Sequence, residues 1–147
     1  MTAGRLVLLV ALTAVAVGVA LILQRRRPDP PSAPSYRAPA QLDRDDFDTA
    51  PGRLLVALFS SSTCDSCPVA WATIGRVIGH GGTARVDVQR IDVQEDAAIH
   101  RRYRIDGVPT TVVADAEGVV VQAFFGPMTD DELAAAVEGA SPSPPAG

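Results

Sequence analysis

The chain has 147 residues, which is enough for one domain of roughly 90–110 residues once the two ends are discounted. Every basic residue is an arginine, and residues 28–147 hold nine of the 13 arginines against all 17 acidic residues. This acidic excess repels nucleic acid, and we exclude nucleic-acid binding on that ground.

The N-terminus carries an uninterrupted run of apolar and small residues from Leu6 to Leu23. At about 1.5 Å per residue, a helix of this length spans roughly 27 Å, close to the hydrocarbon thickness of a bilayer. We therefore predict a single transmembrane anchor at residues 4–24. A cleaved signal peptide is the disfavoured alternative, because the run does not end in a small-residue cleavage site.

The arginines beside this run predict its orientation. Arg25–Arg27 follow the run, whereas Arg5 alone precedes it. The positive-inside rule then places the rest of the chain on the cytoplasmic side of the cell membrane. An extracytoplasmic domain stays open as the alternative, because Arg5 and the amino terminus offset part of the bias.

Two segments flank the predicted domain at residues 42–139. Residues 25–41 are rich in arginine and proline, which predicts an extended, semi-rigid linker. Residues 140–147 are rich in proline and show no apolar pattern, so we expect a disordered tail. A short helix within residues 41–47 is only weakly indicated by their polar composition.

The domain opens with a continuous apolar run, Leu54–Phe59, which predicts a central strand buried on both faces. After the two cysteines, Ala70, Ile74 and Val77 recur at helical spacing. The glycine-rich segment 79–82 then ends the predicted helix.

The remaining patterns predict, in chain order, a strand, a short helix, two strands joined by a turn, and a final helix. They cover residues 86–93, 96–103, 110–114, 119–125 and a segment from 129 onward. Thr129 with Glu132 has the spacing of a capping box at the start of the last helix. The β-α-β-α-β-β-α order predicts parallel strands from the first crossover and an antiparallel pair from the hairpin.

The chain has two cysteines, and Cys64 and Cys67 form a C-x-x-C pair where the predicted helix begins. Such a local pair is typical of a redox-active or metal-binding site. Free N–H groups and the helix dipole favour a thiolate at a helix N-terminus. We therefore predict Cys64 as the attacking thiol and Cys67 as the thiol that resolves the mixed disulfide.

The order of these features resembles thioredoxin. The resemblance covers about residues 52–139 and includes the strand that leads to Cys64–Cys67, and Gly107-Val108-Pro109-Thr110 before the hairpin. It implies an α/β fold, a three-layer sandwich around a mixed parallel and antiparallel sheet, here preceded by the predicted transmembrane helix. It also implies a thiol–disulfide oxidoreductase that needs no cofactor.

By the same resemblance, Pro109 follows a cis peptide bond and lies beside Cys64 and Cys67. The backbone of Val108 is then expected to bind a substrate strand. The expected partners are thiols and disulfides of other proteins. Because the anchor holds the chain near the bilayer, we expect these partners to be membrane-associated. We also expect the chain to be a monomer.

The sequence departs from the thioredoxin pattern at the residues that assist proton transfer. The buried aspartate of thioredoxin corresponds to Leu58, and its partner lysine falls near Val88, so we expect slower exchange. Asp65 between the cysteines is expected to raise the pKa of Cys64 and to make the dithiol a stronger reductant. Alternatively, Asp65 caps the helix.

Other candidate residues carry less weight. Cys64, Cys67, His80 and His100 could be read as a zinc site, but 19 residues separate the histidines, against about three to five in such sites. We therefore expect no metal, with one histidine at a helix end and the other at the surface. Phe124–Phe125 are expected in the core, with one ring available to line a partner groove.

Two functions follow. The first is a membrane-tethered thiol–disulfide oxidoreductase, in the simplest case a protein-disulfide reductase. The second is a binding or redox-sensing module of the same fold whose cysteine pair does not turn over.

Overall fold

The computed structural model describes residues 36–140. The predicted anchor at residues 4–24, most of the predicted linker and residues 141–147 of the predicted tail lie outside the described residues. Ala140, predicted as the first residue of the tail, is instead buried at the end of the last helix. Between residues 36 and 140, no helix is long and apolar enough to cross a bilayer.

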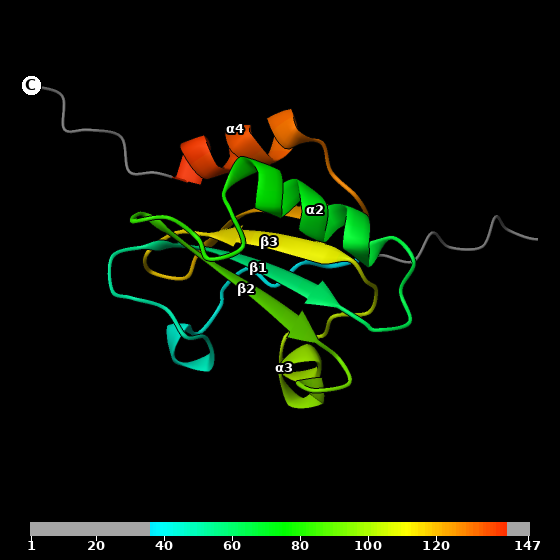
Figure 1. Cartoon of the computed structure of the whole chain (residues 1–147). Coiled ribbons are helices and arrows are strands. Elements are labelled where there is room, and N and C mark those ends of the chain that lie inside the picture. The colour runs from blue at the N-terminus through cyan, green and yellow to red at the C-terminus, as the bar shows by residue number, and fades with distance from the viewer. Residues whose placement is uncertain (1–35, 141–147) are drawn as a thin grey trace, which may run out of the picture. The chain divides into compact units, whose positions relative to one another are not determined.

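The described elements follow the predicted order (Figure 1). They are the 3-10 helix η1 Arg44–Asp46, β1 Leu54–Ser60, α2 Cys67–Val77, β2 Val86–Asp92, α3 Ala97–Arg102, β3 Thr110–Ala114, β4 Val120–Phe125 and α4 Asp130–Ala140. The weakly indicated helix within residues 41–47 is the single turn η1.

The four strands form one mixed sheet in the order β2-β1-β3-β4. β1 pairs in parallel with β2, as the first crossover predicts, and β3 pairs antiparallel with both β1 and β4. Every residue of β1 is buried, which confirms the predicted central strand. Its carboxyl end delivers the chain to the cysteine pair.

Helices cover both faces of the sheet, which confirms the predicted three layers. Helices α2 and α4 lie over one face, and α3 lies against the other (Figure 1). On the first face, Leu58 packs with Ile74 of α2 and Leu133 of α4. On the second face, Phe59 packs with Tyr103, which follows α3. The alternation of Leu58 and Phe59 reflects the two-residue period of a strand.

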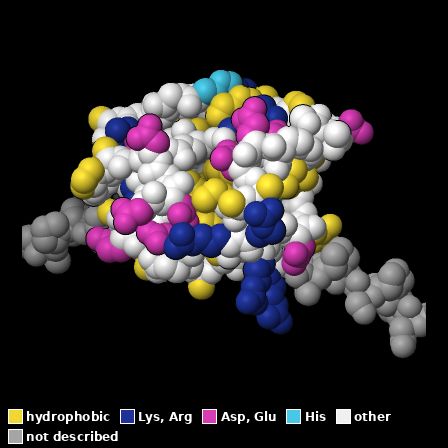
Figure 2. Space-filling model, turned by 90° about the horizontal axis from the view of Figure 1, so that it is seen from below, with side chains coloured by type: hydrophobic (Ala, Val, Ile, Leu, Met, Phe, Trp, Pro, Cys, Tyr) yellow, Lys and Arg dark blue, Asp and Glu magenta, His cyan; other side chains and the backbone are white. Residues whose placement is uncertain are grey.

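On the second face of the sheet, polar contacts connect η1 to α3 and the residue that follows it. Arg102 forms ion pairs with Asp43 at 2.6 Å and with Asp46 at 2.8 Å. The Tyr103 hydroxyl donates a hydrogen bond to Asp46, and burial together with this bond raises the pKa of Tyr103 to about 12. In Figure 2, arginine and acidic side chains both lie across this face.

Residues 36–41 were predicted as linker, and in the structure they lie along the outer edge of β4. The amide of Val120 donates to the carbonyl of Ala40 at 3.0 Å, and Gln41 forms an isolated β-bridge with Val119. The compact unit therefore begins at Tyr36 and not at the predicted residue 42.

The predicted capping box starts α4. The Glu132 carboxylate accepts from the Thr129 amide at 2.8 Å, and the Thr129 hydroxyl accepts from the Glu132 amide at 3.2 Å. These bonds from Thr129, the backbone bond first, lower the pKa of Glu132 below its usual value. The box fixes the point at which the chain turns from the sheet edge into α4.

Candidate active site

The two cysteines lie where the loop after β1 enters α2. They form a disulfide, and their Cα atoms are 5.5 Å apart. Cys67 is the first residue of α2 and is completely buried, whereas Cys64 is half-buried in the loop. Of the two cysteines, Cys64 is therefore the one that another molecule can reach.

The start of α2 directs polar hydrogens at Cys64. The backbone N–H of Cys67 points to the Cys64 sulfur at 3.1 Å, and the Ser66 hydroxyl lies 3.8 Å from it. In this first turn the Val69 amide donates to the Ser66 carbonyl at 3.1 Å, and Pro68 has no N–H to satisfy, so the Cys67 N–H is left to point at the sulfur. A negative charge on Cys64 is stabilised in this geometry.

Asp65 does not cap α2. The cap position is Ser66, and no side chain forms a capping hydrogen bond there. The capping alternative for Asp65 is therefore wrong, because the helix begins one residue later than that role requires. The Asp65 side chain is exposed, and none of the hydrogen bonds or ion pairs among residues 36–140 involves it.

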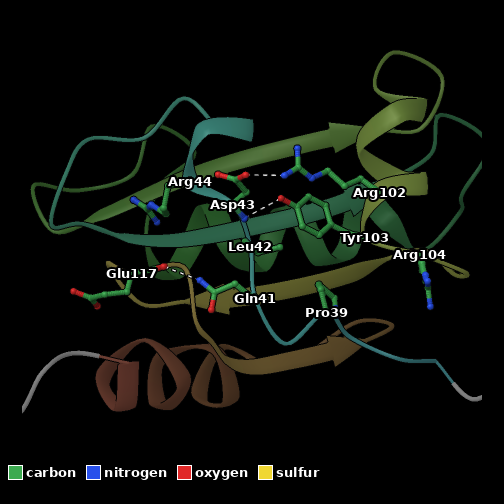
Figure 3. A pocket seen from close by; sticks show the side chains of 9 residues that line it. All are labelled: Pro39, Gln41, Leu42, Asp43, Arg44, Arg102, Tyr103, Arg104 and Glu117. Carbon is green, nitrogen blue, oxygen red and sulfur yellow. Dashed lines mark hydrogen bonds and ion pairs between the residues drawn. The ribbon is translucent and has the colours of Figure 1, made fainter.

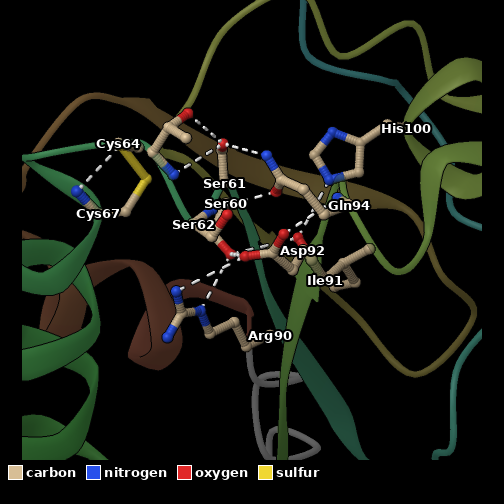
Figure 4. A network of polar contacts seen from close by, with 11 residues as sticks. Ser60, Ser61, Ser62, Cys64, Cys67, Arg90, Ile91, Asp92, Gln94 and His100 are labelled. Carbon is tan, nitrogen blue, oxygen red and sulfur yellow. Dashed lines mark hydrogen bonds and ion pairs between the residues drawn. A yellow bond between two sulfur atoms is a disulfide. The ribbon is translucent and has the colours of Figure 1, made fainter.

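A glutamine that sequence reasoning missed holds the loop before Cys64 (Figure 4). Gln94, just after β2, donates to the Ser61 hydroxyl at 3.0 Å and accepts from the Ser62 amide at 3.1 Å. The Ser61 hydroxyl also accepts from the Thr63 amide at 3.2 Å. Parallel strands end at the same sheet edge, so the residue after β2 could have been expected beside the residue after β1.

The structure corrects the position opposite Leu58. We expected the partner position near Val88, but the register of β1 and β2 pairs Leu58 with Arg90. The number of residues between the two strands does not reveal this register, because the turn between α2 and β2 determines which residue of β2 is the first to pair with β1. Arg90 donates to the buried Ser60 hydroxyl at 3.0 Å and lies 3.8 Å from the Asp92 carboxylate. Leu58 itself is fully buried, and it places an apolar side chain at this point.

The two histidines lie apart from the cysteines in separate contacts. His80 stacks on Trp71 with 4.3 Å between ring centroids, and a Cβ on Gly75 would collide with its ring. His100 is buried, and its Nε2 atom lies 3.0 Å from the Ile91 carbonyl. The expectation of a surface position for His100 was wrong, since the ring fills the space between α3 and the sheet. Among residues 36–140, no cluster of three metal-ligating side chains occurs.

The loop before β3 lies next to the cysteine loop. The Val108–Pro109 peptide bond is cis, as expected. A groove of about 160 Å³ is lined by Ser66, by residues 107–110, and by Tyr36, Phe125 and Gly126. Within the described part of the chain, neither the amide nor the carbonyl of Val108 forms a hydrogen bond. The structure thus brings together the C-x-x-C loop and the predicted residues Val108 and Pro109.

A larger hollow of about 720 Å³ lies away from the cysteines (Figure 3). The Asp43 carboxylate in it is paired with Arg102, and the Gln41 side chain donates to the Glu117 carbonyl at 2.8 Å. The Arg44 guanidinium in the same hollow donates to backbone carbonyls, among them that of Arg53 at 3.0 Å. This hollow offers structural contacts between the N-terminal segment and the sheet, and the groove beside Pro109 is the better candidate for a functional site.

Solved structures share the fold of the described domain. Thioredoxin-2 of the malaria parasite matches with a TM-score of 0.55 and 13% identity, over 62% of this chain and 86% of that one. The chain has the thioredoxin fold. Chloroplastic thioredoxin z matches this fold with a TM-score of 0.53 and 22% identity, over 60% of this chain and 79% of that one. Fasciola hepatica thioredoxin gives 0.53 and 21%, over 62% and 84%. No protein-family model and no curated protein matches the chain.

Proposed function

We propose that the chain is a thiol–disulfide oxidoreductase that reduces disulfides of other proteins through Cys64 and Cys67. One observation carries this proposal. The accessible Cys64 sulfur receives the N–H of Cys67 at 3.1 Å, while the second sulfur, on Cys67, is buried behind it. This arrangement gives one thiol for attack and one for resolution, on a scaffold with the thioredoxin fold.

The reaction proceeds in two exchanges. In the reduced protein, the Cys64 thiolate attacks one sulfur of the substrate disulfide, and the other substrate sulfur leaves as a thiolate. The Cys67 thiol then loses its proton and attacks the Cys64 sulfur of the mixed disulfide. The Cys64–Cys67 bond forms, the second substrate thiol leaves, and two electrons have passed to the substrate. A dithiol reductant must reduce the pair before the next turnover.

The substrate is held in extended form beside Pro109. The unbonded amide and carbonyl of Val108 offer one donor and one acceptor to a neighbouring strand. Strand addition of this kind reads the backbone of the substrate and leaves its side chains for separate recognition. Ser66, two residues after Cys64, lines the groove, so a strand bound there brings its cysteine close to Cys64.

The buried position that could hold a carboxylate to accept the Cys67 proton is occupied by Leu58. Solvent or the departing substrate thiolate takes the proton instead. We expect the second exchange to be the slower one for this reason.

We further propose that residues 4–24 anchor the chain in the membrane, with the domain on the cytoplasmic side. The apolar run Leu6–Leu23 and the three arginines Arg25–Arg27 support this proposal. Partners are then proteins at or in the same membrane. Protease added to intact spheroplasts should leave the domain undigested, and digestion from outside would place it on the other side.

An insulin-reduction assay with dithiothreitol tests the redox proposal. The full chain should accelerate insulin precipitation, and Cys64→Ser should abolish the acceleration. Cys67→Ser, reduced beforehand and mixed with insulin after the dithiothreitol is removed, should accumulate a mixed disulfide at Cys64, detectable as a mass increase that added dithiothreitol reverses. A wild-type chain that does not accelerate the reaction would refute the proposal.

The second candidate function is a binding or redox-sensing module without turnover. The buried Leu58 favours it, because the position beneath the cysteines lacks an acid to assist exchange. Such a module would form the Cys64–Cys67 disulfide reversibly and would bind a partner, but it would show no insulin reduction.

A further inference from the structure

Two half-exposed aromatic rings stand over the groove beside Pro109. Tyr36 is 45% exposed and Phe125 is 44% exposed. Their ring centroids are 5.6 Å apart and their planes differ by 24°, which is a stacked arrangement. Phe124, the preceding residue, packs into the core instead, so the strand turns only the second ring outward.

Both rings are in contact with, or next in the chain to a residue bonded to, the loop that carries the cis proline. A Cβ on Gly107 would collide with the ring of Tyr36, so glycine at this position lets the ring lie against the loop. The amide of Gly126, next to Phe125, donates to the Pro109 carbonyl at 2.8 Å. Both rings are thus fixed relative to the loop that is proposed to bind the substrate backbone.

The segment that carries Tyr36 is itself attached to the sheet. The Ala40 carbonyl accepts from the Val120 amide at 3.0 Å, and Gln41 bridges to Val119 on the edge of β4. The segment before the predicted domain therefore contributes one wall of the groove. Removing the Tyr36 ring would leave this backbone pairing in place.

The lining and the size of the groove suit an uncharged side chain about as large as an aromatic ring. The residues that line it carry no charge, and its volume is about 160 Å³. A space of about 150 Å³ is large enough for a benzene ring, so the volume of the groove matches one aromatic side chain. Aromatic pairs contribute beyond their buried area when rings stack or meet edge to face.

We propose that Tyr36 and Phe125 form a specificity pocket for an aromatic side chain adjacent to the target cysteine of the substrate protein. This inference rests on the proposed reductase function and identifies the substrate segments that the site prefers. Because Ser66, between the two cysteines, lines the same groove, a ring held by Tyr36 and Phe125 belongs to a residue next to the reacting cysteine.

Two peptide disulfides test the pocket in the full chain. Each peptide has one cysteine joined to 5-thio-2-nitrobenzoate, and the two differ only in phenylalanine or alanine after that cysteine. Release of the coloured thiolate measures reduction. We expect the wild type to reduce the phenylalanine peptide roughly three- to tenfold more efficiently, through a lower KM.

Variants then assign the preference. Tyr36→Ala and Phe125→Ala should each remove most of this preference, because each lowers the efficiency with the phenylalanine peptide far more than the efficiency with the alanine peptide, and Tyr36→Phe should retain the preference. Val121→Ala is the matched control, because Val121 lies on the same strand and is 42% exposed. Melting temperatures equal to that of the wild type establish that the variants are folded.

Equal reduction of both peptides by the wild type would overturn the inference. So would a faster reaction of Tyr36→Ala with both peptides, because the ring would then cover the site and not bind substrate. Reduction of hydroxyethyl disulfide separates the two levels of the proposal. If this small disulfide is reduced without a peptide preference, only the pocket is wrong; if it is not reduced either, the reductase function fails as well.

Discussion

Replacing Gln94 tests how the loop that carries Cys64 is held. Its side chain donates to the Ser61 hydroxyl at 3.0 Å and accepts from the Ser62 amide at 3.1 Å. A net hydrogen bond contributes about 0.5–1.5 kcal/mol to stability. Ser62 is exposed, so water can replace that contact, whereas the buried Ser61 has less access to water. We expect Gln94→Ala to lower the free energy of unfolding by about 1–2 kcal/mol.

The measurement is thermal unfolding of the oxidised full chain by circular dichroism. For a domain of this size, a loss of about 1–2 kcal/mol corresponds to a melting temperature roughly 5–10 °C lower. Gln122→Ala serves as the control, because Gln122 is exposed and its side chain makes one hydrogen bond, 3.5 Å long, among residues 36–140. Looser positioning of Cys64 should also slow insulin reduction, since small misplacements of reacting groups reduce rates strongly.

A double-mutant cycle with Ser61→Ala separates this contact from general damage. The two substitutions remove one shared bond, so their combined effect should fall short of the sum by about 1 kcal/mol. Additivity within about 0.3–0.5 kcal/mol would refute the role of Gln94 as the clamp of this loop. An unchanged melting temperature for Gln94→Ala would do the same.

Four further substitutions probe separate features. Asp65→Asn should make the reduction potential of the cysteine pair less negative, because it removes a charge that opposes the Cys64 thiolate; glutathione equilibration measures this, and no shift contradicts it. Leu58→Ala should cost about 2–5 kcal/mol in urea unfolding, and a cost below about 1 kcal/mol would mean that the core collapses around it. Gly118→Ala should also destabilise the chain, because Gly118 has φ +83° and an added Cβ meets the Leu42 carbonyl; a neutral result would refute a tight turn. Glu132→Gln should lower the melting temperature at neutral pH. The pKa of Glu132 is lowered in the folded state, so its stabilisation is present above the unfolded value near 4.5 and disappears as pH falls through the folded pKa. A difference from wild type that persists in acid would refute the cap.

The sequence predicted the layers because strong local signals mark them. Leu54–Phe59 is apolar without interruption, which few structures other than a buried strand allow in a short segment. Thr129 and Glu132 carry the chemistry of a helix start in their side chains and spacing. The resemblance to thioredoxin, carried by the C-x-x-C pair and Pro109, predicted which two loops meet beside the sheet.

The contacts between elements were harder to predict. Arg90 faces Leu58 because of strand register, which depends on a turn that no pattern specifies. Gln94 acts on a loop 32 residues away in the sequence. Tyr36 lies in a segment whose composition predicts a linker, and only its pairing with β4 shows that it belongs to the groove. Such roles come from tertiary packing and carry no local signature.

The reduction potential of the Cys64–Cys67 pair in the full chain tests the central claim most directly. Equilibration against glutathione and dithiothreitol, with the thiol state read by mass after alkylation, gives the value. A reductase with Asp65 beside its attacking thiol predicts a potential near or below about −250 mV. A value of about −180 to −120 mV, typical of isomerases and oxidants, or a pair that never forms a reversible disulfide, would contradict it.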